Sequence, residues 1–216
     1  MPKVNKDYIN KKKTQILDAA FRIFQQKPLY EITMLDVIRE AGISKGGIYR
    51  YFNDIDEVII ALINKKTAQN NYKHKIDQIL TSKNTTEGII EALFTFLGNY
   101  INESSSTLGK FQFELTVYLS NHPEKGEKFK SLLTEQENGQ YLVGSLFNKI
   151  IEGVNKGEFE ASFPLHDIFT YITTTIDGVV NKVVLQKCYG ANEYSIDVIK
   201  IFKIISNSVL HMLAVK

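Results

Sequence analysis

Apolar residues recur along this chain at the spacing of a helix. Between residues 32 and 52, positions i, i+3, i+4 and i+7 of one helical face are occupied by Met34, Val37, Ile38 and Ala41. Similar stripes recur up to residue 212, and we therefore predict an all-α protein of about nine helices. The expected helices span about residues 11–27, 33–41, 45–52, 54–80, 89–101, 107–120, 124–154, 165–185 and 198–212.

The two short helices between residues 33 and 52 are marked at their ends. Thr33 can cap the first helix through its hydroxyl, with Asp36 reaching back from the third helical position. Gly42 supplies the left-handed residue that ends this helix, and Ser44 caps the next one. Two short helices joined by a three-residue turn predict a helix-turn-helix.

The second helix of this pair combines bare backbone with basic and aromatic side chains. Gly46 and Gly47 each cost a helix about 1 kcal/mol relative to alanine, so they need a reason other than helix stability. Close approach to DNA supplies one, because base edges lie between two rows of phosphates. The predicted DNA contacts are Thr33, Ser44, Lys45, Gly46, Gly47, Tyr49, Arg50 and Tyr51. A plain surface pair of helices, with the glycines serving as loop, is the alternative.

These residues divide into two expected roles. Lys45 and Arg50 carry long donors suited to guanine edges, so we expect them to read sequence. The short hydroxyl groups near the helix starts and on the outer face suit the phosphate backbone, where contacts position the protein without reading sequence. This positioning group consists of Thr33, Ser44, Tyr49 and Tyr51.

Residues 11–62 resemble the DNA-binding domain of the tetracycline-repressor (TetR) family of bacterial transcription regulators. The resemblance rests on the apolar segment at residues 16–24, on Thr33, on Ala-Gly-Ile-Ser at residues 41–44 and on Ile-Tyr-Arg-Tyr-Phe at residues 48–52. It implies a homodimeric regulator, most often a repressor, that binds a palindromic operator and leaves it when a small molecule binds the C-terminal part.

Two positions depart from the family pattern. Pro28 stands where the family usually carries glycine, and Ile55 stands where it usually carries lysine. Since that lysine typically touches a phosphate in the family, the resemblance does not imply this backbone contact of each half-site here. Beyond about residue 65 the family diverges, so the resemblance implies the fold there but no residue's role.

Charge is distributed unevenly between the two ends of the chain. Residues 1–52 carry ten Lys and Arg against five Asp and Glu, whereas the remaining residues carry 16 against 19. A basic first part on a mildly acidic remainder is expected of a protein that binds nucleic acid through one part only. We therefore expect a DNA-binding domain over residues 1–53 and a helical ligand-binding and dimerisation domain over residues 54–216.

Composition narrows the class of protein further. The 216 residues are 44% hydrophobic and 23% charged, which is ordinary for a globular protein, and the one cysteine, Cys188, excludes an internal disulfide. No apolar run is long enough to span a membrane, and the first residues lack the apolar core of a signal peptide. We expect a cytoplasmic protein with no membrane partner.

The sequence shows no convergent set of reactive groups. Neither a nucleophile elbow nor a phosphate-cradling glycine loop occurs, and the histidines have no metal-ligand spacing. We therefore expect no enzyme activity, no metal and no cofactor. A helical ligand-binding or enzymatic domain without DNA function is the alternative. The four histidines are His74, His122, His166 and His211.

The C-terminal part is rich in aromatic residues, which is compatible with a ligand cavity and equally with a filled core. The expected effector is an unidentified small molecule with an apolar or aromatic part. The candidate ligand contacts are Phe94, Tyr100, Phe111, Tyr118, Phe147 and Tyr171.

The last two predicted helices are apolar on two faces. One face can pack on the core and the other on a second subunit, and Gly178 would allow close approach of two helices. A deeply buried pair of core helices is the alternative. The candidate interface residues are Ile176, Gly178, Val184, Leu185 and Ile204.

Overall fold

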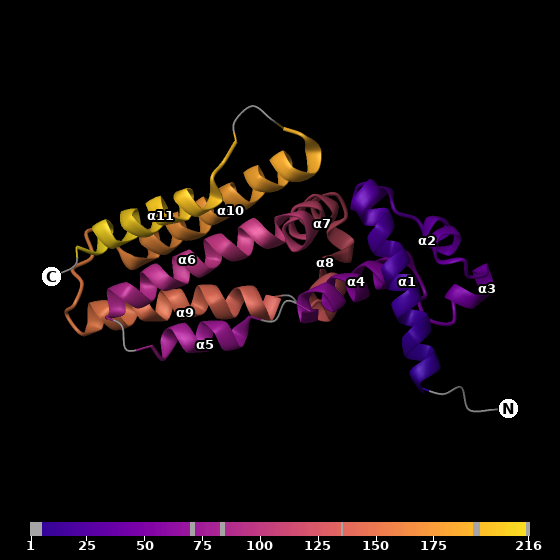
Figure 1. The fold of residues 1–216 in the computed structure, drawn as a ribbon, viewed down its shortest axis with the longest axis horizontal. Helices are drawn as coiled ribbons and strands as arrows, with labels where there is room; N and C mark the ends of the chain where they lie inside the picture. The colour runs from indigo at the N-terminus through magenta and orange to yellow at the C-terminus, as the bar shows by residue number, and fades with distance from the viewer. Residues whose placement is uncertain (1–5, 70–71, 83–84, 135, 192–194, 215–216) are drawn as a thin grey trace. The chain divides into compact units, whose positions relative to one another are not determined.

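The protein is built of α-helices, as the hydrophobic pattern predicts (Figure 1). The computed structural model describes residues 6–69, 72–82, 85–134, 136–191 and 195–214. Within these ranges the α-helices are α1 Lys6–Gln26, α2 Met34–Ala41, α3 Lys45–Ile48, α4 Ile55–Gln69, α5 Lys73–Leu80, α6 Thr86–Ser104, α7 Lys110–Asn121, α8 Gly126–Leu132, α9 Gln136–Asn155, α10 Leu165–Tyr189 and α11 Val198–Leu213. None of the described helices is long and apolar enough to cross a membrane.

Three short turns of other helix types connect these elements. Leu29–Glu31 and Pro123–Lys125 are 3-10 turns, called η1 and η3, and Ser105–Gly109 is a π-helical turn, η2, between α6 and α7. Pro28 precedes η1 with extended backbone, which explains why α1 ends at Gln26.

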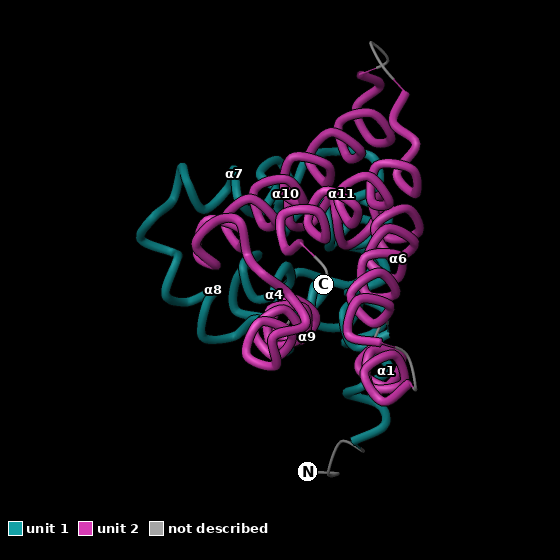
Figure 2. Tube along the Cα trace, turned by 90° about the vertical axis from the view of Figure 1, so that its left-hand side faces the viewer, with its two compact units in different colours: residues 1–70, 114–135 teal, residues 71–113, 136–216 magenta. Residues whose placement is uncertain are grey.

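The chain forms two compact units that do not follow its linear order. Unit 1 holds residues 1–70 and 114–135, and unit 2 holds residues 71–113 and 136–216 (Figure 2). Unit 1 therefore contains the helix-turn-helix, α4 and a second segment from far along the chain. The functional division into residues 1–53 and 54–216 stays a prediction.

The core of unit 1 is formed where α1 contacts both α2 and α4. Phe24 of α1, Val37 of α2 and Ile48 of α3 are fully buried, and Ile63 of α4 joins them. These positions are the apolar stripes of four consecutive helices, so the same residues that give each helix one apolar face also give the unit its core.

Unit 2 is organised around α6, which contacts α11 and α9. Gly98 permits the close approach to α11, because a Cβ atom at this position would lie 2.9 Å from Cβ of Phe202. Gly109 plays the same part in η2, where a Cβ atom would lie 3.2 Å from Cγ2 of Val184 in α10. Small residues thus set the spacing of the longest helices of this unit.

The helix predicted over residues 54–80 is two helices, α4 and α5. Tyr72 lies just before α5, is mostly buried, and its ring packs 4.5 Å from the ring of Tyr100 and 5.6 Å from that of Phe96. Burying this aromatic side chain outweighs helical continuity at the junction. The prediction of one helix over residues 54–80 is therefore wrong.

The helix predicted over residues 124–154 is also divided, into η3, α8 and α9. After α8 the chain is extended at Leu133, and Asn64 of α4 satisfies the freed backbone groups. Its side chain donates to the carbonyl of Leu132 at 2.7 Å and accepts from the N–H of Thr134 at 2.8 Å. Tertiary hydrogen bonds replace helical ones at this break.

The start of the chain and the second helix of the helix-turn-helix also differ from expectation. The first helix, predicted from about residue 11, begins earlier, at Lys6, and residues 1–5 lie outside the described residues. The helix predicted over residues 45–52 is regular only over α3 and continues as turns, since Tyr51 N–H bonds the carbonyl of Ile48 three residues back. Two glycines at its start weaken helix propagation there.

Candidate nucleic-acid interface

The first helix of the helix-turn-helix begins with the predicted capping box. Asp36 N–H donates to Oγ1 of Thr33 at 3.2 Å, while Oδ2 of Asp36 accepts from the N–H and the hydroxyl of Thr33 at 2.9 and 2.6 Å. Lys27 adds an ion pair to the same oxygen at 2.6 Å. The hydrogen bond from Lys27, followed by that from Thr33, lowers the pKa of Asp36 to about 2.

The side chain of Thr33 is therefore already hydrogen-bonded within the fold. Its hydroxyl proton bonds Asp36, so the side chain can donate to a phosphate only by giving up part of the capping box. The predicted phosphate contact of this residue stays a prediction, whereas its role as a cap is confirmed by the capping-box hydrogen bonds.

The turn and the second helix are ordered by two backbone features. Gly42 adopts a left-handed conformation, with φ of 63°, and ends α2. Ser44 then caps α3, because its Oγ accepts from the N–H of Gly47 at 3.2 Å. That bond does not use the proton of Ser44, which can therefore donate to a phosphate. Sequence reasoning predicts both features.

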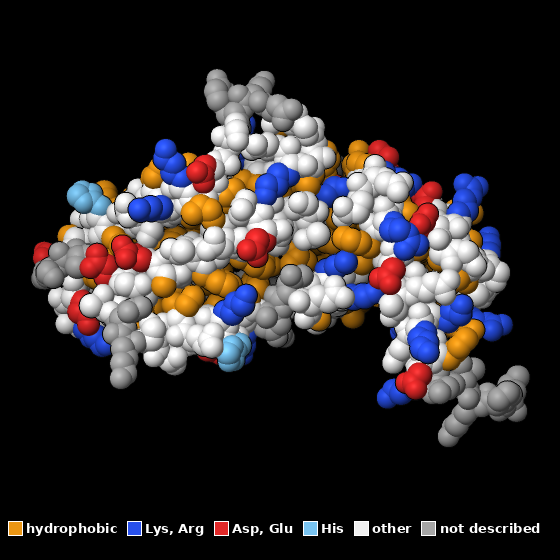
Figure 3. All heavy atoms as spheres, viewed as in Figure 1, with side chains coloured by type: hydrophobic (Ala, Val, Ile, Leu, Met, Phe, Trp, Pro, Cys, Tyr) orange, Lys and Arg blue, Asp and Glu red, His pale blue; other side chains and the backbone are white. Residues whose placement is uncertain are grey.

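Several of the residues predicted to bind DNA are exposed in α3 and directly after it. Lys45, Gly46, Tyr49 and Arg50 are exposed, while Ile48 points into the core. Nothing lies within 4 Å of where a Cβ atom of Gly46 would stand, so its bare backbone is open to a ligand surface. Lys and Arg side chains gather over the part of the molecule that contains α1 to α3 (Figure 3).

Helix α1 supports the helix-turn-helix from one side. The side chain of Gln15 donates to the carbonyl of Ala41 at 2.8 Å, next to the turn residue Gly42. Two residues earlier in α1, the ammonium of Lys13 lies 5.7 Å from the ring centroid of Phe52, the last residue of the recognition segment, residues 45–52. These contacts tie the turn and the end of the helix-turn-helix to α1.

The start of α4 follows the recognition segment at once, and it is acidic. Asp54 accepts from the N–H of Glu57 at 2.9 Å, and Glu57 in turn binds the N–H and the side chain of Asn53, both at 2.8 Å. Ile55, where the family resemblance expects lysine, is the first residue of α4 and offers no charge to a phosphate.

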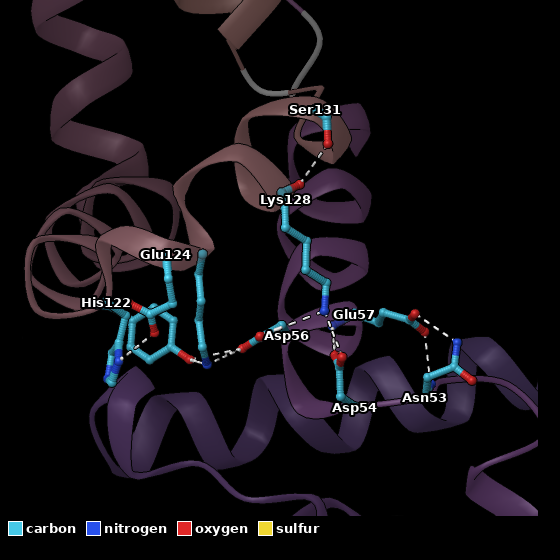
Figure 4. A network of polar contacts seen from close by, with 10 residues as sticks. Asn53, Asp54, Asp56, Glu57, His122, Glu124, Lys128 and Ser131 are labelled. Atoms are coloured by element: carbon cyan, nitrogen blue, oxygen red, sulfur yellow. Dashed lines mark hydrogen bonds and ion pairs between the residues drawn. The ribbon is translucent and has the colours of Figure 1, made fainter.

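Residues from the second segment of unit 1 bind this acidic start (Figure 4). Lys128 of α8 lies 2.7 Å from Oδ2 of Asp54 and 3.7 Å from Oδ2 of Asp56, and Lys125 of η3 lies 3.1 Å from Oδ1 of Asp56. The hydroxyl of Tyr118 donates to Asp56 at 2.9 Å and is itself in contact with Lys125. Sequence reasoning misses all three partners.

Comparison with known proteins agrees with this geometry. A family model described as "Bacterial regulatory proteins, tetR family" matches residues 16–62, from α1 into α4. An uncharacterized HTH-type transcriptional regulator, YfiR of Bacillus subtilis, is 28% identical over 180 residues, which is 83% of each chain. This chain belongs to the TetR family.

Two further comparisons concern regulators of Bacillus subtilis. The fatty acid metabolism regulator protein of Bacillus subtilis is 26% identical over 201 residues, 92% of each chain. The crystal structure of a transcriptional regulator FadR from Bacillus subtilis, in complex with stearoyl-CoA, superposes with a TM-score of 0.55 at 19% identity. That alignment covers 93% of this chain and 97% of the other, so the TetR fold extends over both units.

As a TetR-family member, the chain is a DNA-binding transcriptional regulator and not an enzyme. The expectation of a helix-turn-helix regulator is thereby confirmed. No group of three metal-binding side chains lies together within the part of the chain that the structure describes.

The candidate ligand residues of this TetR-family protein differ in burial and in the unit to which they belong, and their role stays a prediction. Phe94 and Phe111 are fully buried core residues, and Tyr118 belongs to unit 1, where it binds Asp56. Phe147 is half-buried and stacks on Phe169 with ring centroids 4.1 Å apart. Tyr100 is half-buried beside Tyr72, and Tyr171 is exposed on α10.

The candidate interface residues also separate by burial. Val184 is 0% exposed in the single chain, so it is a core residue and not part of a free surface. Ile204 is 50% exposed and Gly178 is exposed, while Ile176 and Leu185 are half-buried. The predicted interface therefore retains four residues, which stay a prediction.

Proposed function

We propose that this TetR-family regulator is a homodimeric repressor that binds a palindromic operator and leaves it when an acyl-coenzyme A thioester binds unit 2. The single observation that carries the DNA part is the capped start of α3, where exposed Lys45 adjoins the open backbone of Gly46 and exposed Arg50 follows two residues after the helix. Bare backbone between two long donors suits the floor and edges of the major groove.

The identity of the effector is supported by relatives and by the surface of unit 2. One relative is named for fatty acid metabolism, and one structural neighbour is complexed with stearoyl-CoA. In unit 2, hydrophobic side chains are visible on the surface between α6 and α9 (Figure 3). The stacked pair Phe147 and Phe169, both half-buried, offers incompletely covered aromatic surface to an apolar chain.

The functional division of the chain forms part of this proposal. Residues 1–53 carry the DNA contacts, and residues 54–216 carry effector binding and dimerisation through α10 and α11. In this division α4 and residues 114–135 serve both parts, because they pack with the DNA-binding helices in unit 1. A regulator of chromosomal genes acts in the cytoplasm, where the operator lies.

The experiment begins with DNA, because the operator is unidentified. Duplexes selected on the purified protein from a random-sequence pool should converge on an inverted repeat, and affinity should fall steeply with salt as phosphate contacts release counterions. Failure to select any sequence, or binding without salt dependence, would contradict a DNA-reading function.

The effector is then tested on the selected duplex. Stearoyl-CoA should weaken binding by roughly ten- to a hundredfold, the usual range of coupling between two sites, while coenzyme A without the acyl chain should not. Sedimentation of the protein with and without stearoyl-CoA should show a dimer in both cases. Release by coenzyme A alone, or no effect of either compound, would contradict the proposed effector.

A further inference from the structure

The start of α4 carries three carboxylates directly after the segment that reads DNA. Asp54, Asp56 and Glu57 all lie in or beside its first turn, where they suit the positive end of the helix dipole. Beside the phosphates of an operator, however, the same charges are repulsive. The chain therefore needs something that holds and neutralises this turn while the recognition segment lies on DNA.

Lys125 and Lys128, here called the lysine pair, meet that need from more than 65 residues away in the sequence. The pair lies within 2.7 to 3.7 Å of Asp54 and Asp56. Asp56 is only 7% exposed, so its carboxylate would be left buried and uncompensated without these partners. The hydrogen bond to Asp54 raises the pKa of Lys128, and the pair therefore stays charged.

Residues 114–134, which carry the lysine pair, contact the N-terminal segment of unit 1 at two other places. Glu114 of α7 is 4% exposed and accepts from the N–H of Leu29, which opens the turn before α2. Asn64, further along α4, bonds the backbone of Leu132 and Thr134. Residues 114–134 therefore contact the chain before the helix-turn-helix, at Leu29, and after it, at Asp54 and Asn64. These contacts on both sides stabilise the position of the helix-turn-helix.

We infer that Lys125 and Lys128 are positioning residues for DNA recognition, which fix the recognition segment by holding Asp54 and Asp56 at the start of α4. This inference rests on the proposed function, because it assumes an operator that α3 reads. The lysine pair acts through the carboxylates and not through a phosphate.

Helix α7 belongs to both units. The division between the two units falls inside α7, whose first residues belong to unit 2 and whose remainder, with Glu114 and Tyr118, belongs to unit 1. Tyr118, which binds Asp56, therefore lies on a helix that begins in unit 2.

The test compares four variants on the duplex selected from the random pool. Lys128→Met should weaken binding by about tenfold, as expected for one lost hydrogen bond between charged groups, and Lys128→Arg should restore it. Lys130→Met is the matched control, because Lys130 is an exposed lysine on the same helix and its loss changes net charge equally. Asp54→Asn removes the charge but keeps the cap, since asparagine caps as well as aspartate.

Two measurements separate positioning from a phosphate contact. If Lys128 acts through Asp54, Lys128→Met should cost much less in the Asp54→Asn background, and the slope of log affinity against log salt should equal that of Lys130→Met. A direct phosphate contact would lower the slope by about 0.9 relative to that control and cost the same in both backgrounds. That result would overturn the inference.

Separate controls distinguish loss of folding from loss of DNA binding. Each variant is assayed for DNA binding only if thermal unfolding shows that it is fully folded. If Lys128→Met is unstable, Tyr118→Phe replaces it in the test. That change removes the hydroxyl that donates to Asp56 and leaves the net charge unchanged. Equal affinity of wild type, Lys128→Met and Tyr118→Phe would overturn the inference alone. Absence of any selected duplex for the wild type would instead overturn the proposed function.

Discussion

The N–H of Gly47 donates to the side-chain oxygen of Ser44 at 3.2 Å, so the recognition helix is capped from within its own opening. This bond leaves no room for a side chain at Gly47, because a Cβ atom there would lie 2.8 Å from Ile43 and 3.0 Å from the Ser44 oxygen. The neighbouring glycine has no such contact within the chain. The two adjacent glycines are therefore present for different reasons.

Gly46→Ala and Gly47→Ala should consequently behave differently. Gly46→Ala should leave the free energy of unfolding unchanged or raise it by up to about 1 kcal/mol, because alanine favours a helix, yet weaken DNA binding by filling the space next to the groove. Gly47→Ala should lower stability by crowding the cap. Thermal unfolding and titration with the selected duplex measure both. Full DNA affinity in folded Gly46→Ala would show that this backbone does not approach DNA.

Lys45 and Arg50 should determine sequence preference. Replacing either by alanine should cost on the order of 1–3 kcal/mol on the selected operator and relax the preference at one base step. Tyr51→Phe should instead weaken binding equally on all duplexes, since its hydroxyl is assigned to the phosphate backbone. A set of single-base operator variants provides the measurement. Uniform losses for Lys45→Ala and Arg50→Ala would reassign both residues to phosphates.

Asp36 should make stability depend on pH in a narrow acid window. Its pKa is held at about 2, below the ordinary value of 3.8, chiefly by the hydrogen bond from Lys27. Because the folded protein has the lower pKa, the stabilisation is complete above about pH 4 and is lost as the pH falls towards 2. Asp36→Asn removes this charge and should therefore lower the free energy of unfolding by roughly 1–2 kcal/mol at pH 7.

The difference between Asp36→Asn and wild type should shrink towards zero at the acid end of that window. Urea unfolding at a series of pH values measures this difference. Lys27→Met should also be less stable than wild type at pH 7, and that difference should shrink over the same acid range. A difference between Asp36→Asn and wild type that stays constant down to pH 2 would mean that the capping box does not depend on the charge of Asp36.

Features set by neighbours in the sequence are predictable, and those set by distant partners are not. Thr33 with Asp36, and Ser44 with the residues after it, follow from spacing alone because a cap and its donor lie three positions apart. The bond from Lys128 to Asp54 joins residues 74 positions apart. The three acids after the recognition segment are a visible sign that some cation must bind there, but not which one.

Aromatic residues show the same limit. Tyr72 interrupts the helix expected over residues 54–80 because its ring packs on Tyr100, and no local sequence pattern predicts that contact. Tyr118 has the spacing of a core or ligand residue, yet its hydroxyl binds the buried carboxylate of Asp56. Periodicity shows that a side chain is covered, whereas the partner that covers it depends on the packing of the whole unit.

The last prediction concerns the second subunit, because a palindrome is read only when two recognition helices are held about one turn of DNA apart. Ile204→Asp places a carboxylate on a half-exposed position of α11, so the monomer should keep its fold. If α11 forms the interface, burying that unpaired charge should cost several kcal/mol of association. Val184→Asp should instead unfold the protein, because Val184 packs against Gly109 in the core.

Sedimentation and circular dichroism separate these outcomes. Ile204→Asp should give monomers with full helix content, and its affinity for the selected operator should fall to the level measured on unrelated duplexes, because one recognition helix alone makes half of the contacts. Lys203→Met, one position earlier on an exposed part of the same helix, changes the net charge by the same one unit and controls for it. If Ile204→Asp remains a dimer with full operator affinity, this face of α11 is not the interface, and the exposed positions of α10 around Gly178 become the surface to test.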